Sequence, residues 1–390
     1  MHSIQRLTAI AGLLALVLAG SLSITHPALA QTAMAGHVYI NDNTAGTNTI
    51  GAFNRQANGM LVPMPGSPFA AGGAGTSTTF PVGPAPQGPL QLSSDGQYLL
   101  AVDAGSNQIS VLGIAADGTL SPVDLVSSGG IEPVSIAVHE DLVYVANDGK
   151  GTTGSNYTGF TLSPRGRLTP LKNSTVSLSS EAIPADVLFS PDGSHLAGTE
   201  VGTSLIDSFV VKNDGRLKAA PGSPFAAGPG PIGSEFSPTE ASHLYVSNAH
   251  GGPNNGTVSA YDVAAKGDLT SIGASPFPDY QTAPCWVEIS HDGQYLFTVN
   301  TASTSISGYQ IRADGSLSLL GTTTMTNPDP GTAALPFDAR LDPTGSFLYV
   351  VDAGTDAVSA FAVNGGTLTE LPSSPTAGPA GATPFGIVVT

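Results

Sequence analysis

The sequence predicts an all-β chain folded as a seven-bladed β-propeller, with four-stranded antiparallel blades and a ring closed by the C-terminal strand. Three observations predict this fold. A short motif recurs seven times at nearly constant spacing, no segment shows sustained helical periodicity, and the two ends of the repeat region hold complementary parts of one repeat.

The first repeated motif is Gly-x-Leu, which follows one strand of each unit. Most copies lie 48 to 52 residues apart, and the residue before the Gly is often Asp or Asn, as a tight hairpin turn prefers. The seven copies begin at Gly59, Gly118, Gly166, Gly215, Gly267, Gly315 and Gly366. The motif therefore predicts one β-hairpin in each unit.

Two further signals predict the other strands. A short apolar strand that ends in Asp, Asn or Glu recurs at 37–42, 98–103, 142–147, 195–200, 243–248, 295–300 and 347–352. A strand that opens near Pro and closes at a turn is clearest at 184–193, with related copies that start at Gln87, Pro133, Pro231, Pro284 and Pro336. Each unit thus holds about four short strands, which is typical of a propeller blade.

The ends of the repeat region favour a closed ring over a solenoid. The chain enters its first unit at the second strand, at His37, and residues 384–390 read as a first strand with no blade after it. Pairing these two segments completes a seventh blade. Closure also removes the exposed strand edges that invite aggregation.

The composition suits a packed β-fold with many turns. Gly at 48 and Pro at 31 make about a fifth of the chain, above the average for globular proteins. They fall between short apolar runs and the hydrophobic fraction is 41%, so they indicate turns and not disorder. Cys285 is the only cysteine, so the fold has no internal disulfide and depends on packing.

The first thirty residues have the pattern of a signal peptide. Arg6 gives a positive start, residues 7–20 are apolar, and Ala28-Leu29-Ala30 is an A-x-A cleavage site. A membrane anchor is the alternative, but the apolar run is shorter than the ~20 residues that a spanning helix needs. We expect 1–30 to be removed near Ala30 and 31–390 to be a single propeller domain, secreted or periplasmic, with no membrane span.

The charge balance excludes some partners. Without Arg6 the chain has 11 Lys and Arg against 29 Asp and Glu, a net charge of −18. This acidic balance is a poor match for nucleic acid or an anionic membrane surface. It is compatible with cations or neutral ligands, and we expect a small-molecule ligand or a protein partner at the face of the central channel.

The repeats resemble those of a known family. The order of strands, the Ser-Pro-Asp-Gly turn at 190–193 and the Asp-Gly-x-Leu hairpins resemble the seven-bladed lactonases, which include a 6-phosphogluconolactonase and a fungal muconate-lactonizing enzyme. The resemblance covers most of 36–390 and implies a propeller fold and lactone chemistry. Short Tyr-Val-x-Asn pieces also resemble the YVTN-like repeats of non-enzymatic propellers on microbial surfaces.

The candidate ligand site lies on the first strands, which line the central channel. Side chains alternate along a strand, and the positions facing the channel carry charges that must be paired or wet. We expect ligand binding by Asp186, Glu235, Trp286, Glu288, Asp338 and Arg340. Trp286 would offer a flat apolar wall to the ligand. The alternative is that Arg340 only neutralises Glu288 or Asp338 as an internal ion pair.

Two other sets of residues could act at the channel mouth. The second strands end at Asp42, Asp103, Asn147, Glu200, Asn248, Asn300 and Asp352. This ring could bind a cation, but its presence in every blade favours hydrogen bonds to local turns. His250 lies in the Gly-rich segment 248–256 and is the one histidine placed to act as a general base. No His/Cys cluster or phosphate loop is present, so we expect no metal and no cofactor.

The resemblance does not extend to the charged residues of the family. Its members carry a His where this chain has Ala185, an Asp-Arg pair where it has Ser204-Leu205, and Arg-His where it has Ile232-Gly233. The favoured hypothesis is therefore a propeller that binds a carbohydrate-type or lactone ligand, or a protein partner, at the channel mouth. The alternative is an extracytoplasmic lactone hydrolase in which Glu288 or His250 activates water and Arg340 stabilises the oxyanion.

Overall fold

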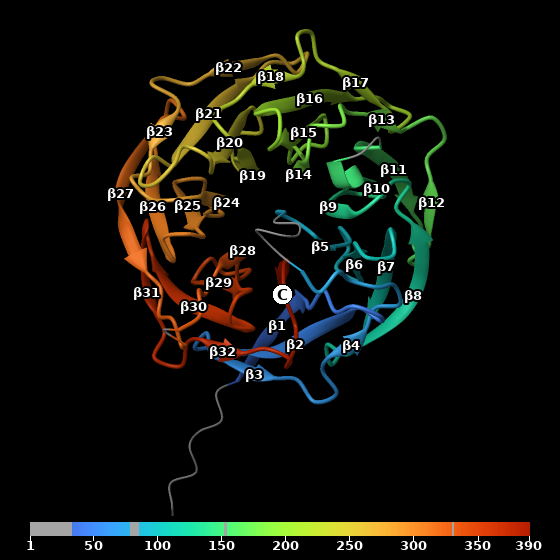
Figure 1. Cartoon of the computed structure of the whole chain (residues 1–390), viewed down its shortest axis with the longest axis vertical. Coiled ribbons are helices and arrows are strands. Elements are labelled where there is room, and N and C mark those ends of the chain that lie inside the picture. The colour runs from blue at the N-terminus through green and yellow to red at the C-terminus, as the bar shows by residue number, and fades with distance from the viewer. Residues whose placement is uncertain (1–32, 79–85, 152–153, 330) are drawn as a thin grey trace, which may run out of the picture. The chain divides into compact units, whose positions relative to one another are not determined.

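Seven antiparallel sheets surround a central axis in the computed structural model (Figure 1), which describes residues 33–78, 86–151, 154–329 and 331–390. The predicted signal peptide lies outside these residues. No α-helix occurs in the described ranges, and a single turn of 3-10 helix spans Gly149–Gly151. No helix there is long and apolar enough to cross a membrane. The predicted all-β seven-bladed propeller is confirmed.

The blades are numbered along the chain. Blade 1 contains β5 (Leu90–Leu92), β6 (Tyr98–Asp103), β7 (Gln108–Ile114) and β8 (Leu120–Ser127). Blade 2 contains β9 (Pro133–His139), β10 (Leu142–Asn147), β11 (Asn156–Leu162), β12 (Leu168–Pro170) and β13 (Val176–Ser177). Blade 3 contains β14 (Pro184–Phe189), β15 (His195–Glu200), β16 (Leu205–Val211), β17 (Leu217–Ala219) and β18 (Phe225–Ala226). Blade 4 contains β19 (Pro231–Phe236), β20 (His243–Asn248), β21 (Thr257–Val263), β22 (Leu269–Ser271) and β23 (Phe277–Pro278). Blade 5 contains β24 (Pro284–Ile289), β25 (Tyr295–Asn300), β26 (Ser305–Ile311) and β27 (Leu317–Thr324). Blade 6 contains β28 (Pro336–Leu341), β29 (Phe347–Asp352), β30 (Ala357–Asn364), β31 (Thr367–Glu370) and β32 (Thr376–Ala377).

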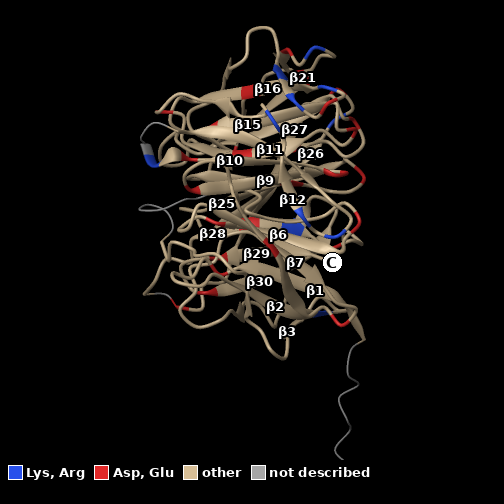
Figure 2. Cartoon of the chain, turned by 90° about the vertical axis from the view of Figure 1, so that its right-hand side faces the viewer, with Lys and Arg blue, Asp and Glu red and all other residues tan. Residues whose placement is uncertain are grey.

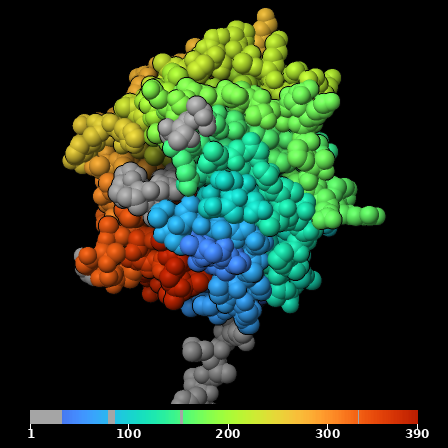
Figure 3. All heavy atoms as spheres, turned by 45° about the vertical axis from the view of Figure 1, so that its right-hand side comes forward, coloured from blue at the N-terminus to red at the C-terminus, as the bar shows by residue number. Residues whose placement is uncertain are grey.

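Blade 7 joins the two ends of the described chain. It contains β1 (Met34–Asn41), β2 (Thr49–Gln56), β3 (Leu61–Pro63), β4 (Phe69–Ala70) and the C-terminal β33 (Ile387–Val389). Strand β33 pairs antiparallel with β1, with Tyr39 opposite Val388, and this confirms the predicted closure. Figure 3 shows the red C-terminal part of the chain against the blue N-terminal part.

One buried side chain reinforces this seam. Arg55 on β2 donates a hydrogen bond of 2.9 Å to the carbonyl oxygen of Thr390 and forms a 3.0 Å ion pair with Asp342 of blade 6. Arg55 is 3% exposed, so its charge depends on these partners. The guanidinium thus ties β33, blade 7 and the neighbouring blade together.

The Gly-x-Leu hairpins also connect neighbouring blades. In blade 7 the hydroxyl of Tyr39 donates 2.8 Å to the carbonyl of Gly118, which lies in the hairpin of blade 1. The same contact is made by Tyr144 with Gly215, Tyr245 with Gly315 and Tyr349 with Gly59. A buried tyrosine hydroxyl needs a polar partner, and the turn supplies it. The repeated motif therefore forms both the hairpin of one blade and a contact with the blade before it.

Candidate functional site

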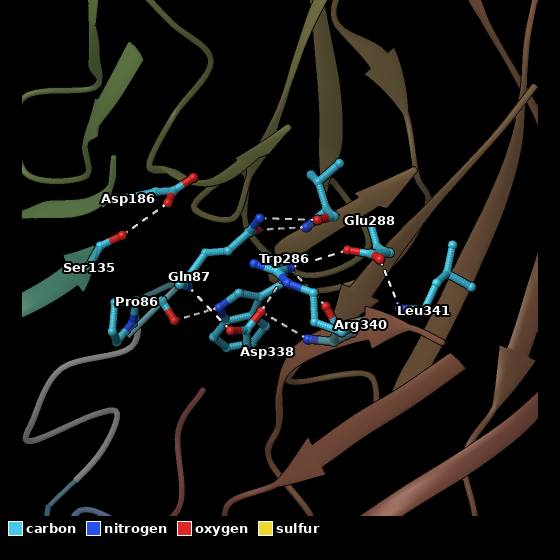
Figure 4. A network of polar contacts seen from close by, with 12 residues as sticks. Pro86, Gln87, Ser135, Asp186, Trp286, Glu288, Asp338, Arg340 and Leu341 are labelled. Atoms are coloured by element: carbon cyan, nitrogen blue, oxygen red, sulfur yellow. Dashed lines mark hydrogen bonds and ion pairs between the residues drawn. The ribbon is translucent and has the colours of Figure 1, made fainter. Parts of the chain in front are cut away.

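Except for Glu235, the predicted channel residues belong to one polar network on neighbouring first strands (Figure 4). Arg340 on β28 lies 3.2 Å from a carboxylate oxygen of Glu288 on β24 and 3.4 Å from Asp338 on its own strand. The second oxygen of Glu288 accepts a 2.8 Å hydrogen bond from the Leu341 backbone N–H. The internal ion pair considered from the sequence is therefore present.

The upper level of the channel, where the first strands begin, is filled by the protein itself. Trp286 is 1% exposed, packs against Phe337 at a ring-centroid distance of 4.7 Å, and donates its indole N–H to the Pro86 carbonyl at 2.7 Å. The expectation that Trp286 offers an open wall to a ligand does not fit this geometry. Asp338 is fully buried at the same level.

The residue that occupies this level is Gln87. Its amide nitrogen donates to the carbonyls of Ser234 (2.9 Å) and Val287 (3.1 Å), and its amide oxygen accepts from the Val287 N–H at 3.0 Å. First strands are edge strands, so their peptide groups on the unpaired edge need partners. The Gln87 carboxamide supplies both a donor and an acceptor. Gln87 was predicted to start a first strand, but β5 begins only at Leu90 and Gln87 crosses the channel instead.

Asp186 joins three blades at this buried level. Its carboxylate accepts hydrogen bonds from the Ser234 N–H (2.9 Å) and hydroxyl (2.7 Å) in blade 4, and from the Ser135 hydroxyl (3.2 Å) in blade 2. Burial raises the pKa of Asp186 to about 7, and the Ser234 donors oppose that rise. Asp186 is only 2% exposed, so it links blades and does not reach a solvent-borne ligand.

The lower level, near the ends of the first strands, is accessible. The Arg340 side chain is 19% exposed and the Glu288 side chain 11%, and Glu235, Gln91 and Leu188 are also partly exposed. Within the described residues Glu235 has no hydrogen-bond or ion-pair partner. Glu235, Glu288 and Arg340 are thus the part of the predicted set that a ligand could reach.

Two carboxyl groups of unequal acidity meet there. Burial, followed by the charge of Glu288, raises the pKa of Glu235 well above its ordinary value. Burial also raises the pKa of Glu288 to about 7, although the Arg340 guanidinium opposes the shift. Both shifts favour the protonated acids, because burial disfavours the charged form of a carboxyl group.

The structure does not bring His250 to this level. His250 is exposed and follows β20 at the end where the second strands finish, whereas Glu288 lies near the other end of β24. Its ring makes no hydrogen bond to another described residue. A general-base role for His250 together with Arg340 remains a prediction that this geometry does not support.

The ring of Asp, Asn and Glu residues is used inside the blades. Asp352 accepts from Ser359 at 2.6 Å, Asp103 from Ser110 at 2.5 Å, and Asn300 donates to Ser307 at 3.0 Å. Each partner lies on the third strand of the same blade. These contacts favour the architectural interpretation of the ring over a cation site, and the described residues hold no cluster suited to a metal ion.

Blade 3 departs from this pattern in a way that sequence reasoning missed. Seven equivalent third-strand residues lie diagonally across from the ring, because each pairs with the second-strand residue two positions before the ring residue: Gly51, Ser110, Thr158, Asp207, Ser259, Ser307 and Ser359. Only blade 3 therefore faces one acid, Glu200, with another, Asp207. Burial and then the charge of Glu200 raise the pKa of Asp207 to about 8. Aligning the third strands of the seven repeats would have revealed the pair.

The family can now be assigned. Residues 72–180 and 236–384 match the model of the lactonase family with a seven-bladed β-propeller. The chain belongs to the seven-bladed lactonase family. No curated protein sequence matches this lactonase-family chain.

Solved structures share its fold. A protein of Bacteroides uniformis, proposed to be a 6-phosphogluconolactonase, superposes with a TM-score of 0.71 at 21% identity over 90% of this chain and 98% of that one. The periplasmic gluconolactonase of Pseudomonas aeruginosa gives a TM-score of 0.67 at 17% identity over 88% and 98%. At these identities the likeness establishes the fold alone.

Gln87 stands where the resemblance would place charged family residues. A Cβ atom on Gly233 would lie 2.1 Å from the Gln87 amide oxygen and 2.6 Å from the Cys285 carbonyl oxygen, so this backbone leaves no room for a His at position 233. The Gln87 N–H also donates to the carbonyl of Ala185, the other position at which the family carries a His. In this lactonase-family chain, Gln87 therefore contacts both positions, 185 and 233, at which the resemblance would place a His.

Proposed function

We propose that this chain binds a small polyhydroxylated ligand of the sugar or sugar-lactone class at the lower level of its channel, and does not hydrolyse it. The observation that carries the proposal is Glu235. Arg340, Glu288, Asp338 and Asp186 all have hydrogen-bond or ion-pair partners, whereas the Glu235 carboxyl has none in the described chain. A partly buried polar group without a partner is best satisfied by a ligand.

The chemistry of this level suits hydroxyl groups. A carboxyl group such as that of Glu235 or Glu288 accepts hydrogen bonds and also donates one when it is protonated, and the Arg340 guanidinium donates. Sugar hydroxyls both donate and accept, so they can use all of these groups together.

The same geometry argues against hydrolysis. The level at which the resemblance places the histidines of the family is occupied by Gln87, and positions 185 and 233 hold Ala and Gly. The remaining candidate base, His250, is at the opposite end of its blade from Glu288. A preorganised set of base and oxyanion donors is the main source of rate in acyl transfer, and the described residues do not assemble one.

A second candidate function rests on Glu288 itself. A carboxyl group with a pKa of about 7, beside Arg340, could act as a general base towards water at neutral pH. Lactone hydrolysis is therefore the alternative that the experiment must separate from binding. A protein partner at the same face is the outcome indicated if no small ligand binds.

The test measures binding and turnover on the same samples. We expect gluconolactone and gluconate to bind in isothermal titration calorimetry, and Glu235→Ala to weaken binding about tenfold, or about 1.4 kcal/mol, because it removes the hydrogen-bonding atoms of the carboxyl group. Glu140→Ala, an exposed turn substitution, is the control and should leave binding unchanged. Unaltered affinity in Glu235→Ala would contradict the site. Lactone opening above the uncatalysed rate that disappears in Glu288→Gln would replace binding with hydrolysis.

A further inference from the structure

Positive charge is confined to one part of the ring. No Lys or Arg occurs between Arg55 and Lys150, and after Arg312 only Arg340 remains. Arg55 is buried and Arg340 lies in the channel, so among the described residues blades 6, 7 and 1 carry no positive side chain outside the channel that is exposed. In Figure 2 most of the blue segments accordingly lie in the upper half of the view.

Half of the Lys and Arg residues of the chain fall within one stretch of 54 residues in blades 2 and 3. We call this set the basic rim: Arg165, Arg167, Lys172, Lys212, Arg216 and Lys218. All six lie on the hairpins that join the third and fourth strands or beside the short fourth strands β12 and β17. They are exposed except for Arg216, which is partly exposed.

The two halves of the basic rim are neighbours in space. The Tyr144 hydroxyl of blade 2 donates 3.0 Å to the carbonyl of Gly215 in the hairpin of blade 3. A Cβ atom on Gly215 would lie 3.2 Å from the side chain of Leu171, the residue next to Lys172. The hairpin with Lys212 and Arg216 therefore packs beside Lys172, and the rim is continuous across the two blades.

Most of this charge is not neutralised. Arg167 pairs with Asp124 at 3.2 Å and Arg216 with Asp214, but the other four members form no ion pair with a described residue. Of the six acids in the same stretch, Asp186, Glu200 and Asp207 are buried inside the propeller. A protein with a net charge of −17 thus exposes a ridge of the opposite sign.

We propose that the basic rim binds a linear carboxylated polysaccharide, a polyuronate. The ridge is narrow. The depression beside it, about 620 Å³, is lined by Glu140, Asp141 and Asp192 as well as by Lys212. A single polymer chain can follow the cations and avoid these acids, whereas a flat anionic bilayer would press its charges against them and against the acidic remainder of the surface.

The residues around the basic rim also favour a polysaccharide over a nucleic acid as the partner. Single-stranded nucleic acids bind to platforms of exposed aromatic side chains, on which the bases stack. The strongly exposed aromatic residue of the described chain is Tyr280, which follows β23 in blade 4 and is not part of the rim. Arg165 and Arg167 line a depression of about 740 Å³ with Ser163, Pro164 and Val123, which offers donors for carboxylates. The adjoining depression contains one aromatic ring, Tyr98, whose hydroxyl donates to the Pro164 carbonyl, so no series of aromatic rings lines these two depressions.

The experiment compares two double variants of equal charge. Arg165→Ser/Lys212→Ser removes two exposed, unpaired cations of the rim, and Lys266→Ser/Arg312→Ser removes two from the equivalent hairpins of blades 4 and 5. We expect the unaltered protein to bind polygalacturonate and to be released as salt rises. The rim variant should lose at least tenfold in affinity and the control less than twofold, with equal melting temperatures.

Three further probes decide the class of partner. Neutral dextran, polyuridylate, and vesicles of equal parts phosphatidylglycerol and phosphatidylcholine are titrated in the same buffer. Binding of polygalacturonate alone supports the proposal. Equal or tighter binding of the vesicles or of polyuridylate overturns it, and so does an equal loss of affinity in both double variants. Absence of polygalacturonate binding at low salt overturns it as well, without bearing on the channel site.

Discussion

Each buried acid in this propeller can be compared with the residues at the equivalent positions of the other blades. Asp352 and Asn300 occupy equivalent ends of second strands, and each contacts a serine on the adjacent third strand, Ser359 and Ser307. The amide needs no ionisation, whereas burial raises the pKa of Asp352 to about 8. An internal repeat therefore shows which neutral side chain the same environment accepts.

This comparison predicts a pH effect on stability. Because the pKa of Asp352 is higher in the folded state than in the unfolded chain, the folded state binds more protons, and the free energy of unfolding falls as pH rises from about 4 to about 8. Asp352→Asn removes that penalty. We expect the free energy of unfolding to rise by on the order of 2 kcal/mol at pH 8 and hardly at pH 4, as measured by urea denaturation.

The control is Asp95, an acid whose pKa is lowered in the folded protein and not raised. Hydrogen bonds from the Ser93 side chain and the Gln97 backbone lower the pKa of Asp95 in an exposed turn, so Asp95→Asn should reduce stability above pH 4. If Asp352→Asn is destabilising at pH 8 as well as at pH 4, the ring residue is needed as an acid and the comparison between repeats is wrong.

Among the elements, the segment that enters β5 differs from every other first-strand entrance. Pro86 and Gln87 cross the channel, and Gln87 bonds to residues 147 and 200 positions away in the sequence. The repeats predicted strands, hairpins and closure because these depend on local patterns. They could not predict the crossing, because a single glutamine has no periodicity and its partners are peptide groups of distant blades.

The crossing residue can be tested through the only tryptophan of the chain. Gln87→Ala leaves the peptide groups of Ser234 and Val287 without partners, and each unsatisfied buried group costs about 1–3 kcal/mol. We expect a clearly lower melting temperature and a red-shifted Trp286 emission, because water reaches the indole. The control Gln91→Ala, on β5, should change neither. An unchanged melting temperature and emission for Gln87→Ala would show that the crossing is not maintained in solution.

The candidate site was also predicted only in part. Alternation along the first strands predicted that Glu235, Glu288 and Arg340 share one level, because side-chain direction follows from the strand period, and the structure brings Glu288 and Arg340 within 3.2 Å. It could not distinguish the accessible level from the filled one, so Trp286 was expected to be open and is buried. That distinction depends on Pro86 and Gln87, which come from outside the repeat.

At the scale of the whole molecule, the surface charge and the predicted leader concern where the protein acts. We propose that residues 1–30 direct export and are removed. In its native cell the protein should be recovered outside the cytoplasm with Gln31 as its first residue, because Ala28-Leu29-Ala30 is a cleavage site. Mass spectrometry of the N-terminal peptide checks this, and a mature protein that retains residues 7–20 would contradict it.

The central claim is that the channel binds an intact polyhydroxylated ligand at its lower level. The most direct measurement is a crystal structure of the protein grown with gluconolactone. The account predicts an unopened ligand, or gluconate formed at the uncatalysed rate, in contact with Glu235 and Arg340, while Gln87 still crosses the channel. A ligand bound at the upper level with Gln87 displaced, or an empty channel at saturating ligand, would contradict the account.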